Sequence, residues 1–211
     1  AYLERLPTSL VYRELINRNG NQVGRFLSEA DNSGRLVREY AYLSAATVVA
    51  GSNEVLIDQL NIVTPGMAQT IQLPYVYEDV LQRYADLASR IGVRIALEGD
   101  SDGRVTSILR AALSDERFPI VESDPVLSVT GTISVGAIPS NEDFESVRWT
   151  VSLDMAGPEG SSLVNYDQED RASGVSEEAA RAFAYRDIEE AVARDFVTAM
   201  RGYFDGLVLS N

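Results

Sequence analysis

The sequence predicts an α+β protein: a mostly antiparallel sheet of about four to five strands packed by two helices, preceded by a helix-rich amino-terminal portion. Three observations predict this class. Apolar residues follow helical spacing over the first part of the chain, the spacing changes to strict alternation near Ile91, and helical spacing returns after Ser176. A change of period from about 3.6 to about 2 marks a change from helices to strands. Strict alternation gives one buried and one solvated face, which is typical of antiparallel sheets.

Residues 1–73 form the predicted helix-rich portion, and its clearest helix is expected to run from Leu36 toward Leu60. A turn precedes this helix, and Ser33 in that turn is the expected helix cap. Residues 61–74 are predicted to be a connector, because they contain a Pro-Gly pair.

The pattern upstream of Leu36 is compatible with either helix or strand. The dipeptide Asn19-Gly20 fits a hairpin turn or a helix break, and both alternatives stay open at this point. We favour a helix over Gln22–Ala30.

Residues 74–211 form the predicted α+β domain, joined to the first portion by a helix over Tyr75–Ser89 that Pro74 opens. Further helices are expected over Val105–Leu113 and, with Ser176 as the cap, from Ser176 to Leu207. Alternation predicts five strands, over Val93–Leu97, Phe118–Glu122, Leu127–Val135, Val147–Met155 and Leu163–Glu169.

The composition excludes several classes of function. The chain has 211 residues, no Cys and no His, and its 18 basic residues are all arginine against 32 acidic ones, which gives a net charge of −14. Thiol nucleophiles, His-based triads, Cys/His zinc sites, Schiff-base lysines and P-loops are therefore impossible. Nucleic-acid binding is not expected, because phosphate backbones need a basic stripe. Docking to anionic lipid is disfavoured for the same reason.

The stretch Glu98–Gly103 partly matches a calcium-binding loop, with acidic residues at the first, third and fifth positions and Gly at the sixth. The twelfth position, which requires an acid, is Leu109, and the intervening residues have helical spacing. We therefore favour a strand-to-helix turn in which Asp102 caps the helix.

Two other groups of polar residues were weighed as catalytic sites. Glu142, Asp143 and Glu145 form an acidic cluster between two predicted strands, and Glu169, Asp170 and Arg171 lie at a strand end. Paired acids about 5–10 Å apart would permit glycoside hydrolysis, but a chain with 32 acids brings some pairs together by chance. Serines such as Ser176 lack a His or Lys base. No catalytic, metal or cofactor-binding residue, and no cofactor, is predicted.

Tyrosines are concentrated in the helical portion, where they fit either amphipathic packing or a partner interface, and packing is favoured. They are Tyr2, Tyr12, Tyr40, Tyr42, Tyr75, Tyr77 and Tyr84.

Three stretches of the second half resemble a group of bacterial envelope lipoproteins: Val93–Asp100 entering a helix, Pro125–Ile133, and Ser176–Ala182 opening the last helix. From Val93 to Leu207 the chain is similar to the module of the Tol-propeller amino-terminal domain, the curli secretion lipoprotein and the penicillin-binding-protein activator lipoproteins. No catalytic residue of that module is carried over.

The resemblance implies a non-enzymatic periplasmic protein that serves as an assembly or docking component of an outer-membrane-associated machine. It further implies protein partners in the envelope, self-association, and membrane attachment only through a lipid on a residue upstream of Ala1. The alternative hypothesis is a carboxylate-dependent hydrolase acting on cell-wall sugar.

Overall fold

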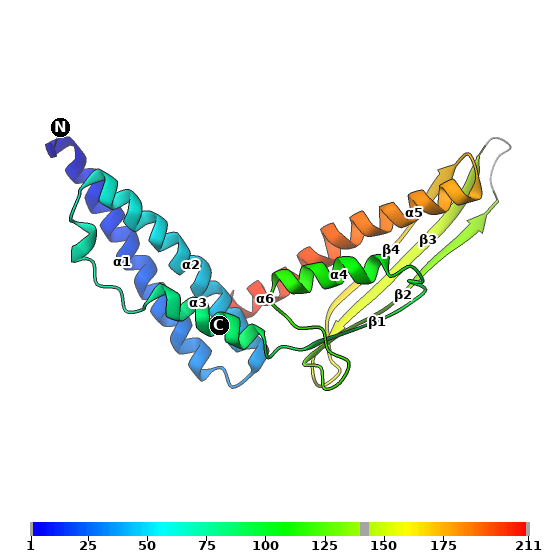
Figure 1. Ribbon diagram of the computed structural model, residues 1–211, viewed down its shortest axis with the longest axis horizontal. Coiled ribbons are helices and arrows are strands. Elements are labelled where there is room, and N and C mark those ends of the chain that lie inside the picture. The colour runs from blue at the N-terminus through cyan, green and yellow to red at the C-terminus, as the bar shows by residue number, and fades with distance from the viewer. Residues whose placement is uncertain (1, 140–143, 210–211) are drawn as a thin grey trace. The chain divides into compact units, whose positions relative to one another are not determined.

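The computed structural model describes residues 2–139 and 144–209 and divides the chain into two compact units. The first unit comprises Ala1–Ala88 with Phe204–Asn211, and the second comprises Ser89–Tyr203. The first unit is helical and the second contains the sheet, so the predicted α+β class is confirmed (Figure 1). The division into a helix-rich portion of residues 1–73 and an α+β domain of residues 74–211 stays a prediction.

The helical unit is a hairpin of two long helices with a third helix on it. Helix α1 (Tyr2–Asn32) packs along α2 (Leu36–Val63), and α3 (Tyr77–Ala88) packs against α2 after the short 3-10 helix η1 (Ala68–Thr70) (Figure 1). The core consists mainly of apolar side chains from these helices, among them Ile16, Val23, Phe26, Tyr40, Leu43, Leu60, Val80 and Leu87.

Helix α1 runs without interruption through Asn19-Gly20, so both the hairpin turn and the helix break were wrong there. The glycine has a packing role instead. A Cβ at Gly20 would lie 3.2 Å from Leu73 Cδ2, and one at Gly24 would lie 3.7 Å from Pro74 Cγ. The connector therefore packs directly on the helix backbone, and this contact offsets the roughly 1 kcal/mol that a glycine costs inside a helix.

Two predicted helix starts in this unit were also wrong. Arg35, not Ser33, is the residue that precedes α2, and it makes no side-chain cap hydrogen bond. Pro74 does not open α3, which begins at Tyr77, because Pro74 lies in the extended connector that contacts α1.

The second unit contains a four-stranded sheet in the order β1-β2-β3-β4. The strands are β1 (Val93–Glu98), β2 (Leu127–Ile138), β3 (Glu145–Ala156) and β4 (Ser162–Gly174). The β1–β2 pair is parallel and the other two pairs are antiparallel, so the sheet is mostly antiparallel as predicted.

The predicted strand at Phe118–Glu122 is not formed; only an isolated bridge joins Ile120 to Val93. Arg117 and Asp124, which flank the segment, have φ angles of 63° and 51°. These left-handed residues turn the chain at both ends, so the extended run is too short to add a strand.

One face of the sheet is covered by α4 (Arg104–Asp115) and α5 (Glu177–Ala191), as Figure 1 shows. Every second residue of β3 points into this interface, namely Val147, Trp149, Val151, Leu153 and Met155, all of them buried. The predicted packing of the sheet by two helices follows directly from this alternation.

The predicted closing helix is present but contains a π-helical turn. Ser176 caps α5 as predicted, accepting a hydrogen bond from the Ala179 N–H at 3.2 Å. The π turn η2 (Val192–Phe196) then leads into α6 (Val197–Leu209).

The buried residues of this helix explain the π turn, because they recur every four positions. In an α-helix each step of four drifts by about 40°, which would carry the apolar face away from its partners. A wider turn reduces that drift. The buried residues at this spacing are Ala180, Ala184, Ile188, Val192, Phe196, Met200 and Phe204, and Ala191 and Val197 are buried beside them.

Candidate functional site

In the turn between β1 and α4, the Asp100 carboxylate caps the start of α4 and does not form part of a metal site. Both carboxylate oxygens of Asp100 accept hydrogen bonds, at 3.2 Å from the Val105 N–H, at 2.8 Å from the Thr106 N–H and at 2.7 Å from the Thr106 hydroxyl. The predicted cap, Asp102, was the wrong residue of this turn, because Gly103 precedes the helix in a left-handed conformation and brings Asp100 back over it. Among described residues, no group of three or more acids is arranged to hold a metal ion.

Of the acidic residues considered as catalytic pairs, those that the structure describes do not gather in an enclosed site. Glu142 and Asp143 lie outside the described residues. Glu169 and Asp170 are consecutive on β4 and therefore point to opposite faces of the sheet, and Glu169 pairs with Arg148 at 3.3 Å. The polar residues that are buried in the described structure are Ser9, Asn53 and Thr64, so no described carboxylate is fully removed from water. The hydrolase alternative stays a hypothesis.

The sheet face opposite the helices is open and lined with short polar side chains. On β2 and β3 these are Ser128, Thr130, Thr132, Ser134, Thr150 and Ser152. The hydroxyls of Ser134 and Thr150 are 2.7 Å apart and share a hydrogen bond.

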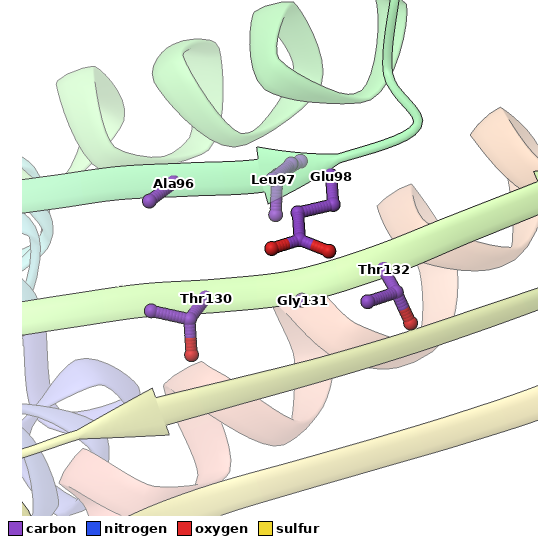
Figure 2. A pocket seen from close by; sticks show the side chains of 6 residues that line it. All are labelled: Ala96, Leu97, Glu98, Thr130, Gly131 and Thr132. Atoms are coloured by element: carbon purple, nitrogen blue, oxygen red, sulfur yellow. The ribbon is translucent and has the colours of Figure 1, made fainter.

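Figure 2 shows a hollow at the β1–β2 side of this face, where the Glu98 carboxylate extends toward β2 between Thr130 and Thr132. A second hollow lies between β3 and β4, lined in part by Ser152 and Asp167. Both are open hollows on a sheet surface, which suits solvation or a flat partner better than an enclosed small substrate.

Three of the seven tyrosines, Tyr40, Tyr42 and Tyr84, pack with one another or with the core, as predicted for the group. The Tyr40 and Tyr84 hydroxyls are 3.2 Å apart, and the Tyr40 ring contacts Phe204 edge-on with centroids 5.2 Å apart. Tyr42 packs near Phe26, with a centroid distance of 6.4 Å. These contacts hold the helices together.

Buried Asn53 connects α2 with α1 and the connector. Its side-chain amide donates to the Ile16 carbonyl and to the Tyr75 hydroxyl, both at 3.0 Å. Burial raises the pKa of Tyr75 above its ordinary value of 10.0; the hydrogen bond from Asn53 opposes this shift and the negative charge of Glu54 adds to it.

The outward side of α2 carries exposed aliphatic side chains beside one exposed acid, Asp58. Val48, Val55 and Ile62 lie seven residues apart and are 67, 56 and 76 % exposed. Seven residues return a helix to nearly the same face, with a drift of about 20°. Ser52 and Gln59 lie on the same face because each is four residues beyond a valine. We call these five residues the α2 outer face.

A groove in the same unit adjoins the α2 outer face through Val48. Phe26 of α1 and the carboxyl-terminal residues Val208 and Leu209 of α6 line it together with Val48 and Val49. The groove is open and mostly apolar, with Asp205 as its one charged lining residue, so apolar surface extends beyond α2 itself.

The sequence prediction missed the α2 outer face, although its seven-residue spacing was there to be found. Spacing alone does not distinguish a buried stripe from an exposed one, and the structure shows that α1 packs on the opposite side of α2, where Asn53 and Leu60 are fully buried.

Comparison with known proteins gives partial likenesses only. No protein-family model matches the chain, and no curated protein matches it. A minor lipoprotein from Acinetobacter baumannii is 11 % identical, with a TM-score of 0.39, over 51 % of this chain and 93 % of that one. The rare lipoprotein B from Shewanella oneidensis is 15 % identical, with a TM-score of 0.30, over 56 % of this chain and 92 % of that one. Both solved structures are bacterial lipoproteins, and likeness at this level does not carry their function over.

No helix in the described part of the chain combines the length and apolar character needed to cross a membrane.

Proposed function

We propose that this protein is a non-enzymatic component of the bacterial cell envelope that docks protein partners in an outer-membrane-associated machine. The α2 outer face carries the proposal. It leaves three large aliphatic side chains in water on one helix face, in a chain with a net charge of −14. Large apolar side chains gathered on one exposed face are a feature of interaction sites.

The distribution of charge favours docking through the helical unit. That unit has 7 arginines and 11 acidic residues, whereas the sheet-containing unit has 11 arginines and 21 acidic residues. The helical unit therefore repels another acidic protein less than the second unit does. Self-association through the α2 outer face is part of the proposal.

The proposed location is the periplasm, with attachment to the outer membrane by a lipid on a residue upstream of Ala1. The resemblance of residues 93–207 to envelope lipoproteins of the Tol-propeller and curli-secretion type supports this location. The precursor sequence tests the proposed location. A lipobox cysteine upstream of Ala1 would support it, and an initiator Met directly before Ala1 would contradict it.

Two matched substitutions test the docking surface. Val55→Glu places a charge at the centre of the α2 outer face, and Val175→Glu places the same charge at a valine that is 83 % exposed in the other unit. Sedimentation equilibrium of the wild-type protein at about 0.15 M salt, where the Debye length is about 8 Å, is expected to give a mass above 23.1 kDa. The excess mass should be lost in the first variant and retained in the second.

Docking of other proteins is tested in cells with a photo-crosslinking amino acid at position 55 or 175. A discrete crosslinked product is expected from position 55 and none from position 175. A mass of 23.1 kDa at every protein and salt concentration, together with no crosslink specific to position 55, contradicts the proposal.

A further inference from the structure

Part of one edge of β2 has no strand beside it. In the parallel pair, β1 reaches only as far as Glu98, which lies opposite Thr132. Strand β2 continues to Ile138, and its other side stays paired with β3 throughout (Figure 1). Residues 133–138 therefore form an edge within the described sheet, and we call this segment the β2 free edge.

Alternation along the strand identifies the backbone groups that face outward. The Val135 carbonyl accepts a hydrogen bond from Arg181 of α5, so it points away from β3. The N–H and C=O of one strand residue point to the same side, and the side alternates from residue to residue. The outward groups are therefore those of Ile133, Val135 and Ala137, while Ser134 and Gly136 bond to β3. Gly99 lies against the Ile133 carbonyl, so Val135 and Ala137 are the outward residues beyond the end of β1.

The end of β1 is set by a backbone contact rather than by chain length. Gly99 has a φ of +83°, and a Cβ built on it would lie 1.9 Å from the Ile133 carbonyl oxygen. Only glycine fits this turn, which directs the chain toward α4. The position in line with β1, beside Val135 and Ala137, is left without a strand.

This edge differs from the other long edge of the sheet. The β4 edge carries Asp167, Glu169, Asp170 and Arg171. Charged side chains are the usual protection of a strand edge against pairing with another chain. The β2 free edge has the sequence Ile-Ser-Val-Gly-Ala-Ile, with no charge and with three β-branched residues, which suit a strand.

Arg181 is the side chain that contacts the edge from α5. Its guanidinium is 3.0 Å from the Val135 carbonyl oxygen and 2.8 Å from Glu177. The side chain is 41 % exposed, so it can leave the carbonyl while keeping its ion pair with Glu177. An incoming backbone N–H can then replace it.

We propose that the β2 free edge takes up an extended segment of a protein partner, which adds a strand in line with β1. The segment is uncharged along the strand and is flanked by basic residues. Glu98 lies at one end of the edge, and Glu177 lies with Arg181 beside Val135. The whole unit has 21 acidic residues and 11 arginines, which favours basic flanks. A second copy of this chain fits worse, because its own acids would face these acids.

The test uses the full chain and a labelled peptide, Arg-Thr-Val-Thr-Val-Thr-Val-Arg, in fluorescence polarisation. One control peptide replaces both Arg residues by Glu, and the other replaces the central Thr-Val by Pro-Pro. The Arg-ended peptide is expected to bind at least tenfold more tightly than either control, since it alone supplies both the charge and the backbone donors. Equal binding of all three peptides overturns the proposal.

Two variants test whether the peptide binds at the β2 free edge. Ala137→Pro removes an outward N–H and spares the hydrogen bonds of β2 to β3, because proline is tolerated at strand edges. It should weaken peptide binding about fivefold to tenfold, which is the effect expected for the loss of one hydrogen bond. Arg181→Ala removes the competing donor and should strengthen binding by a similar factor. Unchanged affinity in both variants overturns the proposal.

Two further measurements keep the test decisive if Ala137→Pro fails to fold. Amide chemical shifts of Val135 and Ala137 in the wild-type protein should move on titration with the Arg-ended peptide, more than those of Ser134 and Gly136. Shifts confined to other residues overturn the proposal. A second result would also overturn the proposal. If the wild-type protein forms a dimer, if Arg181→Ala strengthens that dimer, and if the peptide does not dissociate it, then the edge binds a second copy of the chain. The β2 free edge and the α2 outer face lie in different units, so each proposal fails or stands by itself.

Discussion

Replacing Asp100 by Ala should destabilise the sheet-containing unit by removing the cap of α4. The carboxylate accepts from the N–H groups of Val105 and Thr106 and from the Thr106 hydroxyl. The two N–H groups belong to the first turn of α4, where they have no partner within the helix. The matched control is Asp102→Ala, which removes an exposed acid from the same turn.

The expected loss follows from those three contacts. Loss of a capping side chain costs about 0.5–2 kcal/mol, and a carboxylate near a helix start contributes about 0.3–1 kcal/mol through the helix dipole. Since such terms are not fully additive, we expect Asp100→Ala to cost about 2 kcal/mol. Asp100→Asn keeps one acceptor oxygen and should cost about half as much, and Asp102→Ala less than about 0.5 kcal/mol.

Urea unfolding followed by tryptophan fluorescence measures this directly. The chain has a single tryptophan, Trp149, which is 1 % exposed in the core of the sheet-containing unit. With a slope of about 2 kcal/mol per molar urea, Asp100→Ala should lower the midpoint by about 1 M. Equal midpoints for Asp100→Ala and Asp102→Ala would refute the capping argument. A midpoint that rises on adding Ca²⁺, and does so only when Asp100 is present, would show that the turn is a calcium site.

Three further predictions concern other contacts. Gly99→Ala should cost about 3 kcal/mol by the same fluorescence assay, because the new Cβ would meet the Ile133 carbonyl in a left-handed conformation; a loss below about 1 kcal/mol would contradict this. Ser176→Ala should cost about 1 kcal/mol through the lost cap of α5, and an unchanged midpoint would show the cap to be dispensable. Burial raises the pKa of Tyr75 above 10.0, so its neutral form stabilises the fold below that pH, and this contribution is lost as pH rises through the folded-state pKa. Urea unfolding followed by circular dichroism should therefore show stability falling with alkaline pH in the wild type and falling less in Tyr75→Phe; identical pH profiles would count against it.

Local pattern was sufficient to predict the elements whose two sides differ in polarity. Strict alternation over Val147–Met155 predicts β3, because a strand with one buried face needs apolar residues at every second position. Ser176 followed by two acids predicts the start of α5, because a cap acts on N–H groups within its own turn. The class of the protein and the missing thiol, imidazole and amine chemistry also follow from the sequence alone.

Elements that depend on partners distant in sequence were not predictable in this way. Asn19-Gly20 stays helical because Leu73 and Pro74 pack against the glycine. Phe118–Glu122 fails to form a strand because left-handed residues at both ends turn the chain. In each case a distant contact or a backbone angle overrides the local preference that the residue types suggest.

The candidate surfaces were decided by the tertiary structure for the same reason. The spacing of Val48, Val55 and Ile62 is visible in the sequence, but their exposure depends on which side of α2 receives α1. The β2 free edge exists because β1 ends at Gly99 while β2 runs on to Ile138. A sequence pattern states which faces are apolar, whereas the packing of the helices and the relative lengths of paired strands determine which faces and edges remain uncovered.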